Sequence, residues 1–389
     1  MNEIRNGGSN GLRGWMEGSE NVDLILEKAS FTGNKTLKVG NQEISGGNIY
    51  INVGTRPRIP TIEGIQNVPW MDSAGLLDMK SVPEHLIVLG GGYIGVEFAQ
   101  VYRRFGAKVT IIQRSPQLMP REDADVANTI RDFLMEEGIN IRFGASAKAV
   151  RQENRKIHLT VEIDGQDEVI MGSDLLLAIG RIPNSDTLNL MATDIYITER
   201  GYIQVDDYCR TGVGGVFALG DVNGQGAFTH TSVNDAEIVL DYLYGGTRTI
   251  SQRIPIYGLF TDPPLGRVGM SEKEALASGR KVLKAERPMS SISRAKEMGE
   301  TKGFAKLLVD AETDLILGAS ILGVGGDEIV NMFAAIMHSD IPCRHYREVV
   351  LVHPTVSELM PWILDGIKEA KKKSRASKEF ILSKDLSSC

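Results

Sequence analysis

A glycine-rich turn between a strand pattern and a helix pattern constrains the fold of this chain most. The run GGGYIG at residues 90–95 matches GxGxxG and follows the apolar run LIVL. Gly90 allows a tight turn, Gly92 lets a pyrophosphate approach the helix N-terminus, and Gly95 permits the helix to pack closely on the strand. A turn of this composition without a ligand is the alternative interpretation. Because strand, turn and helix occur in the required order, the sequence predicts a dinucleotide-binding βαβ unit.

The elements around this turn are predicted from hydrophobic periodicity. The next strand is VTII, a second helix is expected from Asp125 to Glu137, and the strand INIRF comes after it. A hairpin that turns at Asp164-Gly165 then leads to the strand DLLLAI. The residues expected on one face of the first helix are Ile94, Phe98, Val101, Tyr102 and Phe105, and those expected to face inward from the second are Val126, Ile130, Phe133 and Leu134.

The position that should contact the ribose of the nucleotide lies at the end of the second strand, where the sequence has Gln113-Arg114. No acid is present there for a free 2′-hydroxyl, and an arginine can pair with a 2′-phosphate, so NADPH is favoured over NADH. Arg114 could equally be a surface charge. Glu97, two residues beyond Gly95, could order the nicotinamide or could complement the helix dipole as an acid of the first turn.

The chain before this unit is expected to form a loop followed by short strands. Residues 1–20 are rich in Gly, Asn and Ser with little apolar periodicity, which predicts a loop or a frayed end. The runs DLILEKASF, TLKV, QEIS and NIYINV then predict an antiparallel patch that ends in an apolar strand. That strand leads into Gly54 and Pro57, and the strand DLLLAI leads into Gly180 and Pro183. The same Gly-x-x-Pro exit therefore occurs twice.

The second half of the chain has a different pattern. Residues 185–254 contain the strand VFAL, which stops at Gly220-Asp221. An acid there can bind a sugar or ribityl hydroxyl, although Gly-Asp pairs are common in turns. The strands and helices after residue 255, including the apolar helix EIVNMFAAIM and a last helix after His353-Pro354, predict a separate α+β domain. The run from Lys368 to Lys378 has six cations and one acid, and we expect it to be solvated and disordered.

His353 and Glu358 are the second candidate for chemistry. A carboxylate five residues after the imidazole can orient it, so the pair can act as an acid/base. Taken alone, the same residues could be a helix-capping histidine and its neighbour. The other histidines, including His230, have no ligand spacing, and we predict no metal site.

Charge and cysteine content exclude several classes of protein. Lys and Arg number 43 against 50 Asp and Glu, and the formal net charge of −7 disfavours binding to nucleic acid or to an anionic membrane. Three widely spaced cysteines argue against a secreted disulfide framework and fit a reducing compartment. No run approaches the roughly 18 apolar residues of a membrane span, and the first residues lack a signal peptide's apolar stretch. We therefore expect a cytoplasmic protein.

The chain resembles the pyridine nucleotide-disulfide oxidoreductases in six segments that occur in the family's order. These segments are GGGYIGVEFA, LAIGRIPN, VFALGDV, LFTDPPLGRVGMSEKEA, LILGASIL and HPTVSE. Two further segments, QRSPQLMPRED and VNGQGAFTHTSVNDAEIV, are most similar to mercuric-reductase-like flavoproteins, including the copper(II) reductase type that responds to reactive chlorine. The resemblance extends over residues 20–365.

This resemblance implies an α/β fold with a Rossmann-type NAD(P)-binding domain inserted in an FAD-binding domain, here incomplete, and followed by an α+β dimerisation domain. It places the FAD-binding domain at residues 1–80 and 185–254, the NAD(P)-binding domain at 81–184, the dimerisation domain at 255–365 and a basic tail at 366–389. The implied activity is that of an NAD(P)H- and FAD-dependent homodimer. Hydride would pass from NADPH to flavin and then to a metal ion or disulfide acceptor.

The resemblance also implies roles for individual residues. The three glycines of the turn would bind the NAD(P) pyrophosphate, Glu97 would contact the nicotinamide, and Arg114 matches a strand-end arginine of mercuric reductases. Asp221 would hold the FAD ribityl chain, while Gly54 and Gly180 would mark the two crossings between the FAD and NAD(P) domains. The implied cofactor-binding set is Gly90, Gly92, Gly95, Glu97, Arg114, Gly180, Gly54 and Asp221.

His353 and Glu358 would form the acid/base pair that family members donate across the dimer interface to the partner's active site. Two parts of the family's pattern are missing, namely an initial GxGxxG unit for the ADP half of FAD and a CxxxxC redox disulfide. The sequence therefore resembles a family member that lacks its first segment. Two alternatives stay open: a non-catalytic NAD(P)H-binding dimer that senses or scaffolds, and a dihydrolipoamide dehydrogenase or glutathione reductase homologue.

Overall fold

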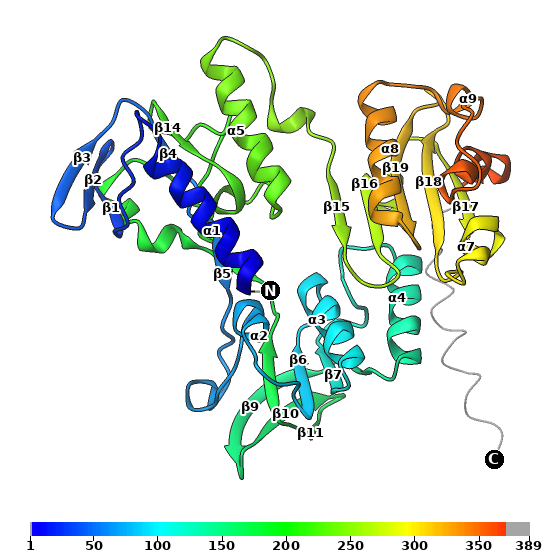
Figure 1. Ribbon diagram of the computed structural model, residues 1–389, viewed down its shortest axis with the longest axis horizontal. Helices are drawn as coiled ribbons and strands as arrows, with labels where there is room; N and C mark the ends of the chain where they lie inside the picture. Colours follow the sequence, from blue (N-terminus) through cyan, green and yellow to red (C-terminus); the bar gives the residue numbers. More distant parts are fainter. Residues whose placement is uncertain (1, 371–389) are drawn as a thin grey trace. The chain divides into compact units, whose positions relative to one another are not determined.

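The computed structural model describes residues 2–370, which form two compact units (Figure 1). Unit 1 contains residues 2–56 and 181–253, and unit 2 contains residues 57–180 and 254–370. None of the helices in this described part of the chain has both the length and the apolar character needed to cross a membrane.

Unit 1 consists of small sheets and helices. Its strands are β1 (Ala29–Gly33), β2 (Thr36–Val39), β3 (Gln42–Ser45), β4 (Ile49–Ile51), β5 (Thr55–Pro57), β13 (Arg181–Pro183) and β14 (Val216–Ala218); its helices are α1 (Asn2–Glu17) and α5 (Thr229–Leu243), with 3₁₀ turns η2 (Asn184–Thr187), η3 (Leu190–Ala192), η4 (Gly220–Asn223) and η5 (Ile250–Gln252). The sheets are the antiparallel β1-β2-β3, the parallel pair β4–β14 and the pair β5–β13. Ile49 and Ile51 pack with Val216 in the core, and Val239 packs α5 against Phe217 of β14.

The N-terminal segment differs from the prediction of a loop, because residues 2–17 form α1. Their Gly, Asn and Ser content lowers helix propensity. Ile4, Leu12 and Trp15 nevertheless fall on one helical face, and this spacing was the signal that could have identified the helix. All three side chains are exposed, so the sequence offered no core position to support it.

The run DLILEKASF is only partly a strand. β1 begins at Ala29, and residues 23–28 pair with no strand of the described chain. Ile25 and Leu26 are exposed there, whereas Phe31 of β1 pairs with Leu37 of β2 and is buried. A strand needs a neighbour for its backbone N–H and C=O groups, so pairing decided where β1 begins. The predicted strands TLKV and QEIS are confirmed as β2 and β3.

The first part of unit 2 is a βαβ unit with an added antiparallel sheet. Its elements are η1 (Ile65–Asn67), α2 (Ser73–Leu77), β6 (His85–Leu89), α3 (Tyr93–Arg104), β7 (Lys108–Gln113), α4 (Ala124–Glu136), β8 (Asn140–Phe143), β9 (Ser146–Glu153), β10 (Lys156–Ile163), β11 (Gln166–Gly172) and β12 (Asp174–Leu177). The parallel sheet has the order β12-β6-β7-β8, and the antiparallel one β11-β10-β9. The hairpin turns at Asp164 and Gly165, with φ of 51° and 77°, as predicted.

The predicted inward face of α4 is confirmed, and that of α3 is confirmed only in part, since Tyr102 is buried and Phe98 packs against the core. Val126, Ile130, Phe133 and Leu134 of α4 are buried. On α3 the buried apolar residues are Val96, Ala99 and Tyr102, while Val101 and Phe105 are exposed. Small residues at positions 95 and 99 let α3 approach the sheet closely, so the helix is rotated away from the stripe of large side chains that its sequence suggested.

Residues 57–80, which we expected in the FAD-binding part, pack within unit 2. Glu63 forms a β-bridge with Ala149, and Met71 forms one with Leu176 of β12. Leu76 of α2 is fully buried in the core of the parallel sheet. These contacts tie the segment to the βαβ unit, although its own pattern contains no strong strand or helix.

The second part of unit 2 is an antiparallel sheet of order β15-β16-β19-β18-β17-β20. Its strands are β15 (Ile256–Leu259), β16 (Leu265–Gly269), β17 (Val282–Pro288), β18 (Phe304–Asp310), β19 (Ile316–Leu322) and β20 (Lys368–Glu369), with helices α6 (Glu272–Ala277), α7 (Ser293–Glu297), α8 (Gly326–His338) and α9 (Cys343–Tyr346) and turns η6 (Met289–Ser291), η7 (Ser357–Leu359) and η8 (Pro361–Gly366). The predicted apolar helix is α8, which buries Val330, Phe333 and Ile336. The predicted α+β pattern is therefore present.

One prediction about the C-terminal region is wrong, and a second is contradicted at two residues and otherwise untested. The expected helix after His353-Pro354 is replaced by the short 3₁₀ turns η7 and η8, because Pro361 has no N–H for a continuing helical ladder. Within the basic run expected to be disordered, Lys368 and Glu369 form β20, which pairs with Lys284 and Leu283 of β17. The rest of that run, residues 371–378, lies outside the described residues.

Candidate functional site

The glycine turn of unit 2 connects β6 to α3, and two of its glycines lie where no side chain fits. Gly90 has a φ of 110°, and a Cβ there would lie 2.4 Å from the carbonyl oxygen of Ala178. A Cβ at Gly95 would lie 2.0 Å from the carbonyl oxygen of Gly90. The turn and the close approach of α3 therefore require glycine at both positions.

Gly92 lies in open space instead. A Cβ at this position would have no described atom within 4 Å. Gly92 is the N-cap of α3, and no side chain in the described part of the chain caps the helix there. The first N–H groups of a helix lack partners within it and form the positive end of its dipole. The N-terminus of α3 can therefore bind the pyrophosphate of a dinucleotide.

The side chain of Gln113 stabilises the glycine turn by hydrogen bonds, a role that was not predicted from the sequence. Its side chain is buried, and its Oε1 accepts a hydrogen bond of 2.9 Å from the N–H of Gly91. Its Nε2 donates to Ser115 Oγ at 2.5 Å and to the carbonyl of Gln117 at 2.9 Å. Gln113 therefore holds the turn and the following segment together. A polar residue at the end of an otherwise apolar strand was the available signal.

Arg114 is exposed and forms no hydrogen bond or ion pair with the rest of residues 2–370. Arg121, in the segment after β7, has the same properties and was not singled out from the sequence. Neither guanidinium is neutralised, so each can pair with an external phosphate. Both lie after the strand that should approach the nucleotide ribose.

Glu97 belongs to the second turn of α3, so the dipole-complementing role in the first turn is wrong. Its Oε1 accepts a hydrogen bond of 2.8 Å from the N–H of Phe260, just after β15. Burial raises the pKa of Glu97 above its ordinary value, and this hydrogen bond opposes the shift without cancelling it. The carboxylate is thus held by the antiparallel sheet region of unit 2.

Asp221 of unit 1 is presented by η4, directly after β14. Its Oδ2 accepts a hydrogen bond of 2.7 Å from Thr55 Oγ1, and the Arg181 guanidinium lies 4.0 Å from the same oxygen. Arg181 also donates to Thr55 Oγ1 and to its carbonyl. Within the described chain Oδ1 has no hydrogen bond, and the carboxylate is partly exposed, so it fits an external hydroxyl such as one of the FAD ribityl chain.

Gly54 and Gly180 lie next to the two places where the chain passes between the units. Their φ values are 65° and 110°. The chain enters unit 2 after Arg56 and returns to unit 1 after Gly180. The Gly54 carbonyl accepts from the N–H of Asn184 in unit 1, and the Gly180 carbonyl accepts from that of Arg58 in unit 2. Both crossings thus begin with a left-handed turn that favours glycine.

His353 and Glu358 form the expected contact. His353 Nδ1 lies 2.8 Å from Glu358 Oε2 and 3.1 Å from Oε1. The His353 side chain is 77% exposed, whereas that of Glu358 is 12% exposed. The carboxylate holds Nδ1, and the Nε2 edge of this exposed ring makes no hydrogen bond within the described chain. Val350 and Val352, just before His353, are also exposed.

The two described cysteines, Cys209 and Cys343, are buried and are not paired with each other. Burial raises the pKa of each thiol to about 12, so neither forms a nucleophilic thiolate near neutral pH. They lie in different units, and Cys389 is outside the described residues.

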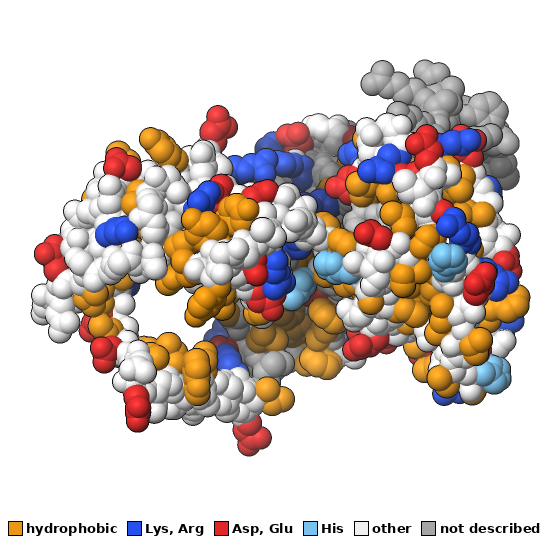
Figure 2. Space-filling view, turned by 90° about the horizontal axis from the view of Figure 1, so that it is seen from above, with side chains coloured by type: hydrophobic (Ala, Val, Ile, Leu, Met, Phe, Trp, Pro, Cys, Tyr) orange, Lys and Arg blue, Asp and Glu red, His pale blue; other side chains and the backbone are white. Residues whose placement is uncertain are grey.

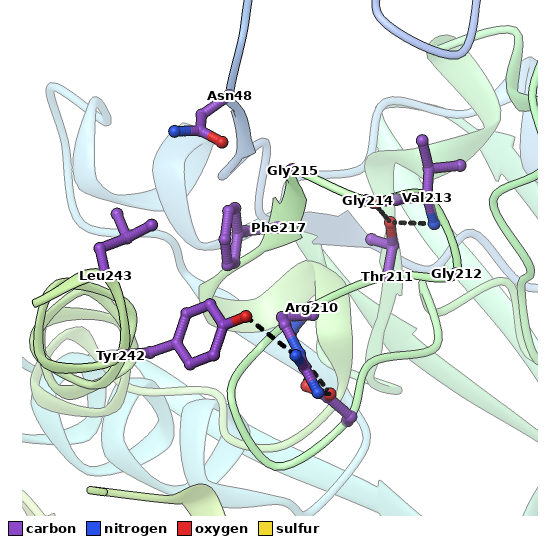
Figure 3. A pocket seen from close by; sticks show the side chains of 11 residues that line it. Asn48, Arg210, Thr211, Gly212, Val213, Gly214, Gly215, Phe217, Tyr242 and Leu243 are labelled. Carbon is purple, nitrogen blue, oxygen red and sulfur yellow. Dashed lines mark hydrogen bonds and ion pairs between the residues drawn. The ribbon is translucent and has the colours of Figure 1, made fainter. Parts of the chain in front are cut away.

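A cavity of about 380 Å³ in unit 1 contains none of the predicted site residues (Figure 3). Arg210, Phe217 and Tyr242 are among the residues that line it. Arg210 donates to Asp206 at 2.6 Å and to the Tyr242 hydroxyl at 2.9 Å. Its charge is already balanced, so this cavity offers no free cation for a nucleotide phosphate.

Three carboxylates of unit 2, those of Asp125, Glu272 and Glu286, lie close enough to share a metal ion. The ammonium groups of two lysines form ion pairs with these carboxylates. Lys306 Nζ lies 2.8 Å from Asp125, and Lys284 Nζ lies 3.3 Å from Glu272 and 3.1 Å from Glu286. The cluster is therefore balanced by side-chain cations.

Comparisons with known proteins match both units. The pyridine nucleotide-disulphide oxidoreductase model matches residues 7–236, and the dimerisation domain of the same family matches residues 256–364. The chain is 38% identical over 355 residues to the probable pyridine nucleotide-disulfide oxidoreductase RclA of Escherichia coli K12, covering 90% of this chain and 80% of that protein. It is 32% identical to a mercuric reductase of Staphylococcus aureus, covering 79% of this chain and 56% of that protein.

A solved structure is similar as well. The Cu(II) complex of the HOCl-induced flavoprotein disulfide reductase RclA from Escherichia coli matches with a TM-score of 0.86 and 36% identity. The match covers 94% of this chain and 83% of that one. The architecture described above is therefore that of a flavoprotein disulfide reductase.

Proposed function

Because this chain belongs to the pyridine nucleotide-disulphide oxidoreductase family, whose FAD-dependent members use NAD(P)H, we propose that it oxidises NADPH and reduces a metal ion or a disulfide. The mercuric reductases among its relatives and the Cu(II) complex of RclA support a metal-ion acceptor. The match to the dimerisation domain supports a homodimer. Buried, unreactive Cys209 and Cys343 suit the cytoplasm as its compartment.

The observation that carries this proposal is the open N-terminus of α3 at Gly92, beside two glycines that admit no side chain. In the proposed complex the α3 N–H groups bind the NADPH pyrophosphate. Arg114 pairs with the 2′-phosphate, and Glu97 orients the nicotinamide. We assign NAD(P)H binding to residues 57–180 of unit 2 and FAD binding to unit 1, with Gly54 and Gly180 at the crossings.

Asp221 is proposed to hold FAD through its ribityl hydroxyls, since its Oδ1 is available. When bound, FAD supplies a ring that accepts hydride from NADPH and passes the electrons on. His353, oriented by Glu358, donates protons to the thiolates that form when a disulfide acceptor is reduced, and it does so in the partner subunit's site. A chain that only senses or scaffolds needs neither the oriented imidazole nor Asp221, which counts against that alternative.

The first test is anaerobic addition of NADPH to the FAD-loaded protein, followed by the visible flavin absorbance. We expect the flavin band to bleach. In the Arg114→Ala variant NADPH should bind roughly tenfold or more weakly, because a charge-assisted pair with the 2′-phosphate is lost, while NADH affinity should not change. Arg131→Ala, an exposed arginine of α4, is the control. A band that persists with excess NADPH contradicts the proposed electron transfer, and equal losses for both nucleotides contradict the role of Arg114.

The second test concerns the acid/base pair. Glu358→Gln should slow reduction of a disulfide acceptor by about tenfold and His353→Ala by about a hundredfold, because protonation of the product thiolates loses its positioned imidazole. Neither change should alter the rate at which NADPH bleaches the flavin. His345→Ala, an exposed histidine of α9, is the control. Stopped-flow measurement of both steps separates them, and slower bleaching in His353→Ala is the result that would place this residue elsewhere in the mechanism.

A further inference from the structure

Glu122 joins two tyrosines that come from different parts of unit 2. The Tyr93 hydroxyl donates to Glu122 Oε1 at 2.7 Å, and the Tyr257 hydroxyl donates to the same oxygen at 2.5 Å. The two rings pack edge to face, with centroids 5.7 Å apart. A carboxylate that accepts two hydroxyl hydrogen bonds on one oxygen fixes both rings.

The Glu122 side chain of this cluster is buried, whereas Tyr93 and Tyr257 are half-buried. Glu122 is 6% exposed, and its Oε2 is buried without a hydrogen-bond partner in the described chain. Burial, followed by the nearby Glu122 carboxylate, raises the pKa values of Tyr93 and Tyr257 above their ordinary value, so both hydroxyls stay protonated donors near neutral pH. A buried carboxylate with one unsatisfied oxygen lowers the stability of the fold. We therefore expect Glu122 to have a role other than packing.

The positions of the three residues indicate that role. Tyr93 is the first residue of α3 and directly follows Gly92. Glu122 ends the segment that begins after β7, and Met119 in that segment donates its N–H to the Gly91 carbonyl at 2.8 Å. Tyr257 lies on β15, which pairs with β16, and its hydroxyl lies 3.4 Å from that of Tyr93. The cluster thus connects the glycine turn to the antiparallel sheet.

The next residue strengthens the same connection. Asp123 accepts hydrogen bonds from Lys306 of β18 at 2.9 Å and from the N–H of Glu272 at 3.0 Å, and it lies 3.4 Å from Arg267 of β16. Residues 122 and 123 therefore both attach the segment after β7 to the antiparallel sheet. Of these two residues, only Glu122 also hydrogen-bonds to Tyr93, which directly follows Gly92 of the glycine turn.

We propose that Glu122 is a positioning residue that fixes Tyr93 at the N-terminus of α3. Because Tyr257 of the antiparallel sheet holds the same carboxylate, it sets the affinity of the glycine turn for NADPH. The physical reason is preorganisation. Tyr93 is the first residue of α3, and its side chain is already held by Glu122. The backbone N–H groups around it therefore need no ordering before they bind the pyrophosphate. This inference rests on the proposed function, since it assigns NADPH to the turn.

Isothermal titration of the FAD-loaded protein with NADPH tests the proposal without any need for turnover. We expect Tyr257→Phe and Glu122→Gln each to weaken NADPH binding about threefold to tenfold, although neither residue lies in the turn. Tyr257→Phe should have a smaller effect in a Tyr93→Phe background, because the two hydroxyls act through one carboxylate. Such coupling is a readout that general loosening of the structure does not produce.

Two tyrosines elsewhere in unit 2, both buried, provide the controls. The Tyr102 hydroxyl donates to the Leu76 carbonyl at 2.5 Å from the same helix, and the Tyr346 hydroxyl lies 3.8 Å from Met332 Sδ on the antiparallel sheet side. Tyr102→Phe and Tyr346→Phe should leave NADPH affinity unchanged.

The outcomes separate the two proposals. If the unsubstituted protein binds no NADPH, the proposed function fails. If it binds NADPH and Tyr257→Phe binds equally well, or if the controls lose as much affinity, the positioning role of Glu122 is overturned and the proposed function stands. Phe keeps each ring in place, so these variants are expected to fold, and thermal unfolding of each variant checks this directly.

Discussion

Lys306→Met is expected to lower the free energy of unfolding by about 3–5 kcal/mol. The Lys306 side chain is 1% exposed, and its Nζ lies 2.9 Å from Asp123, 2.8 Å from Asp125 and 3.4 Å from Glu272. Removal of this cation leaves buried Asp123 with only the Arg267 guanidinium, at 3.4 Å, and leaves Asp125 with no ion pair in the described chain, and methionine offers neither carboxylate a donor. Urea unfolding followed by circular dichroism measures the loss.

The pH dependence should identify the cause. Burial acts to raise the pKa of Asp123, but attraction to Lys306 and a hydrogen bond from the Glu272 N–H outweigh it, so the pKa lies below its ordinary value. Burial acts to lower the pKa of Lys306, but attraction to Asp125 and Asp123 outweighs it, so this pKa is raised. The Asp123 contribution is present above about pH 4 and is lost as pH falls through its folded pKa. The Lys306 contribution is present below about pH 10 and is lost as pH rises through its folded pKa.

Acidification, which destabilises the unsubstituted protein through Asp123, should have the opposite effect on the stability difference of Lys306→Met. Without the cation, protonation of the buried carboxylates relieves their repulsion, so Lys306→Met should gain stability relative to the unsubstituted protein on acidification towards about pH 4. Lys302→Met is the control, since Lys302 pairs with Glu136 at 2.8 Å at an exposed site and should lose at most about 1 kcal/mol. Equal losses in the two variants, or a difference that does not change with pH, are results this explanation does not allow.

Alanine at Gly92 and alanine at Gly95 should fail in different ways. Gly92 has a φ of −81°, and its Cβ position is open, so Gly92→Ala should keep the thermal stability of the protein. The added methyl group occupies the place where the pyrophosphate approaches, so NADPH affinity should fall at least about tenfold. Gly95→Ala should instead lose about 1–3 kcal/mol or more, because its Cβ would lie 2.0 Å from the Gly90 carbonyl oxygen.

Gly33→Ala, on a strand of unit 1, is the control for both variants, because its Cβ position is also open. Differential scanning calorimetry and NADPH titration on all three proteins make the comparison. Undiminished NADPH affinity in a stable Gly92→Ala protein would remove the turn from the nucleotide site. A stable Gly95→Ala protein would show that α3 can shift away from β6 at little cost.

Figure 2 illustrates why the sequence alone does not show which apolar side chains are exposed. Apolar side chains also gather on the surface of the molecule. Trp15, in the segment predicted to be a loop, and Phe105, on the predicted apolar face of α3, are both exposed. Apolar character shows which side chains can be buried, but the neighbouring elements decide which are. For that reason the inward face of α4 was predicted correctly and that of α3 only in part.

The sequence by itself determined the parts of this protein that depend on neighbouring residues. The glycine turn at residues 90–95, the hairpin at Asp164-Gly165 and the contact of His353 with Glu358 all lie within a few positions along the chain. Turn preferences and strand or helix periods act over such short distances, so the pattern alone predicts them. The family's six segments in order extended these local features to the whole architecture.

Only the tertiary structure decided the contacts between distant segments. Glu122 and Tyr257 are 135 residues apart, and Asp123 and Lys306 are 183 apart. No spacing rule predicts such pairs, because they form only when the antiparallel sheet packs beside the segment after β7 and excludes water from charged and hydroxyl groups together. The chemistry of the glycine turn is therefore encoded locally, whereas the way its first helical residue is held depends on how the two parts of unit 2 pack.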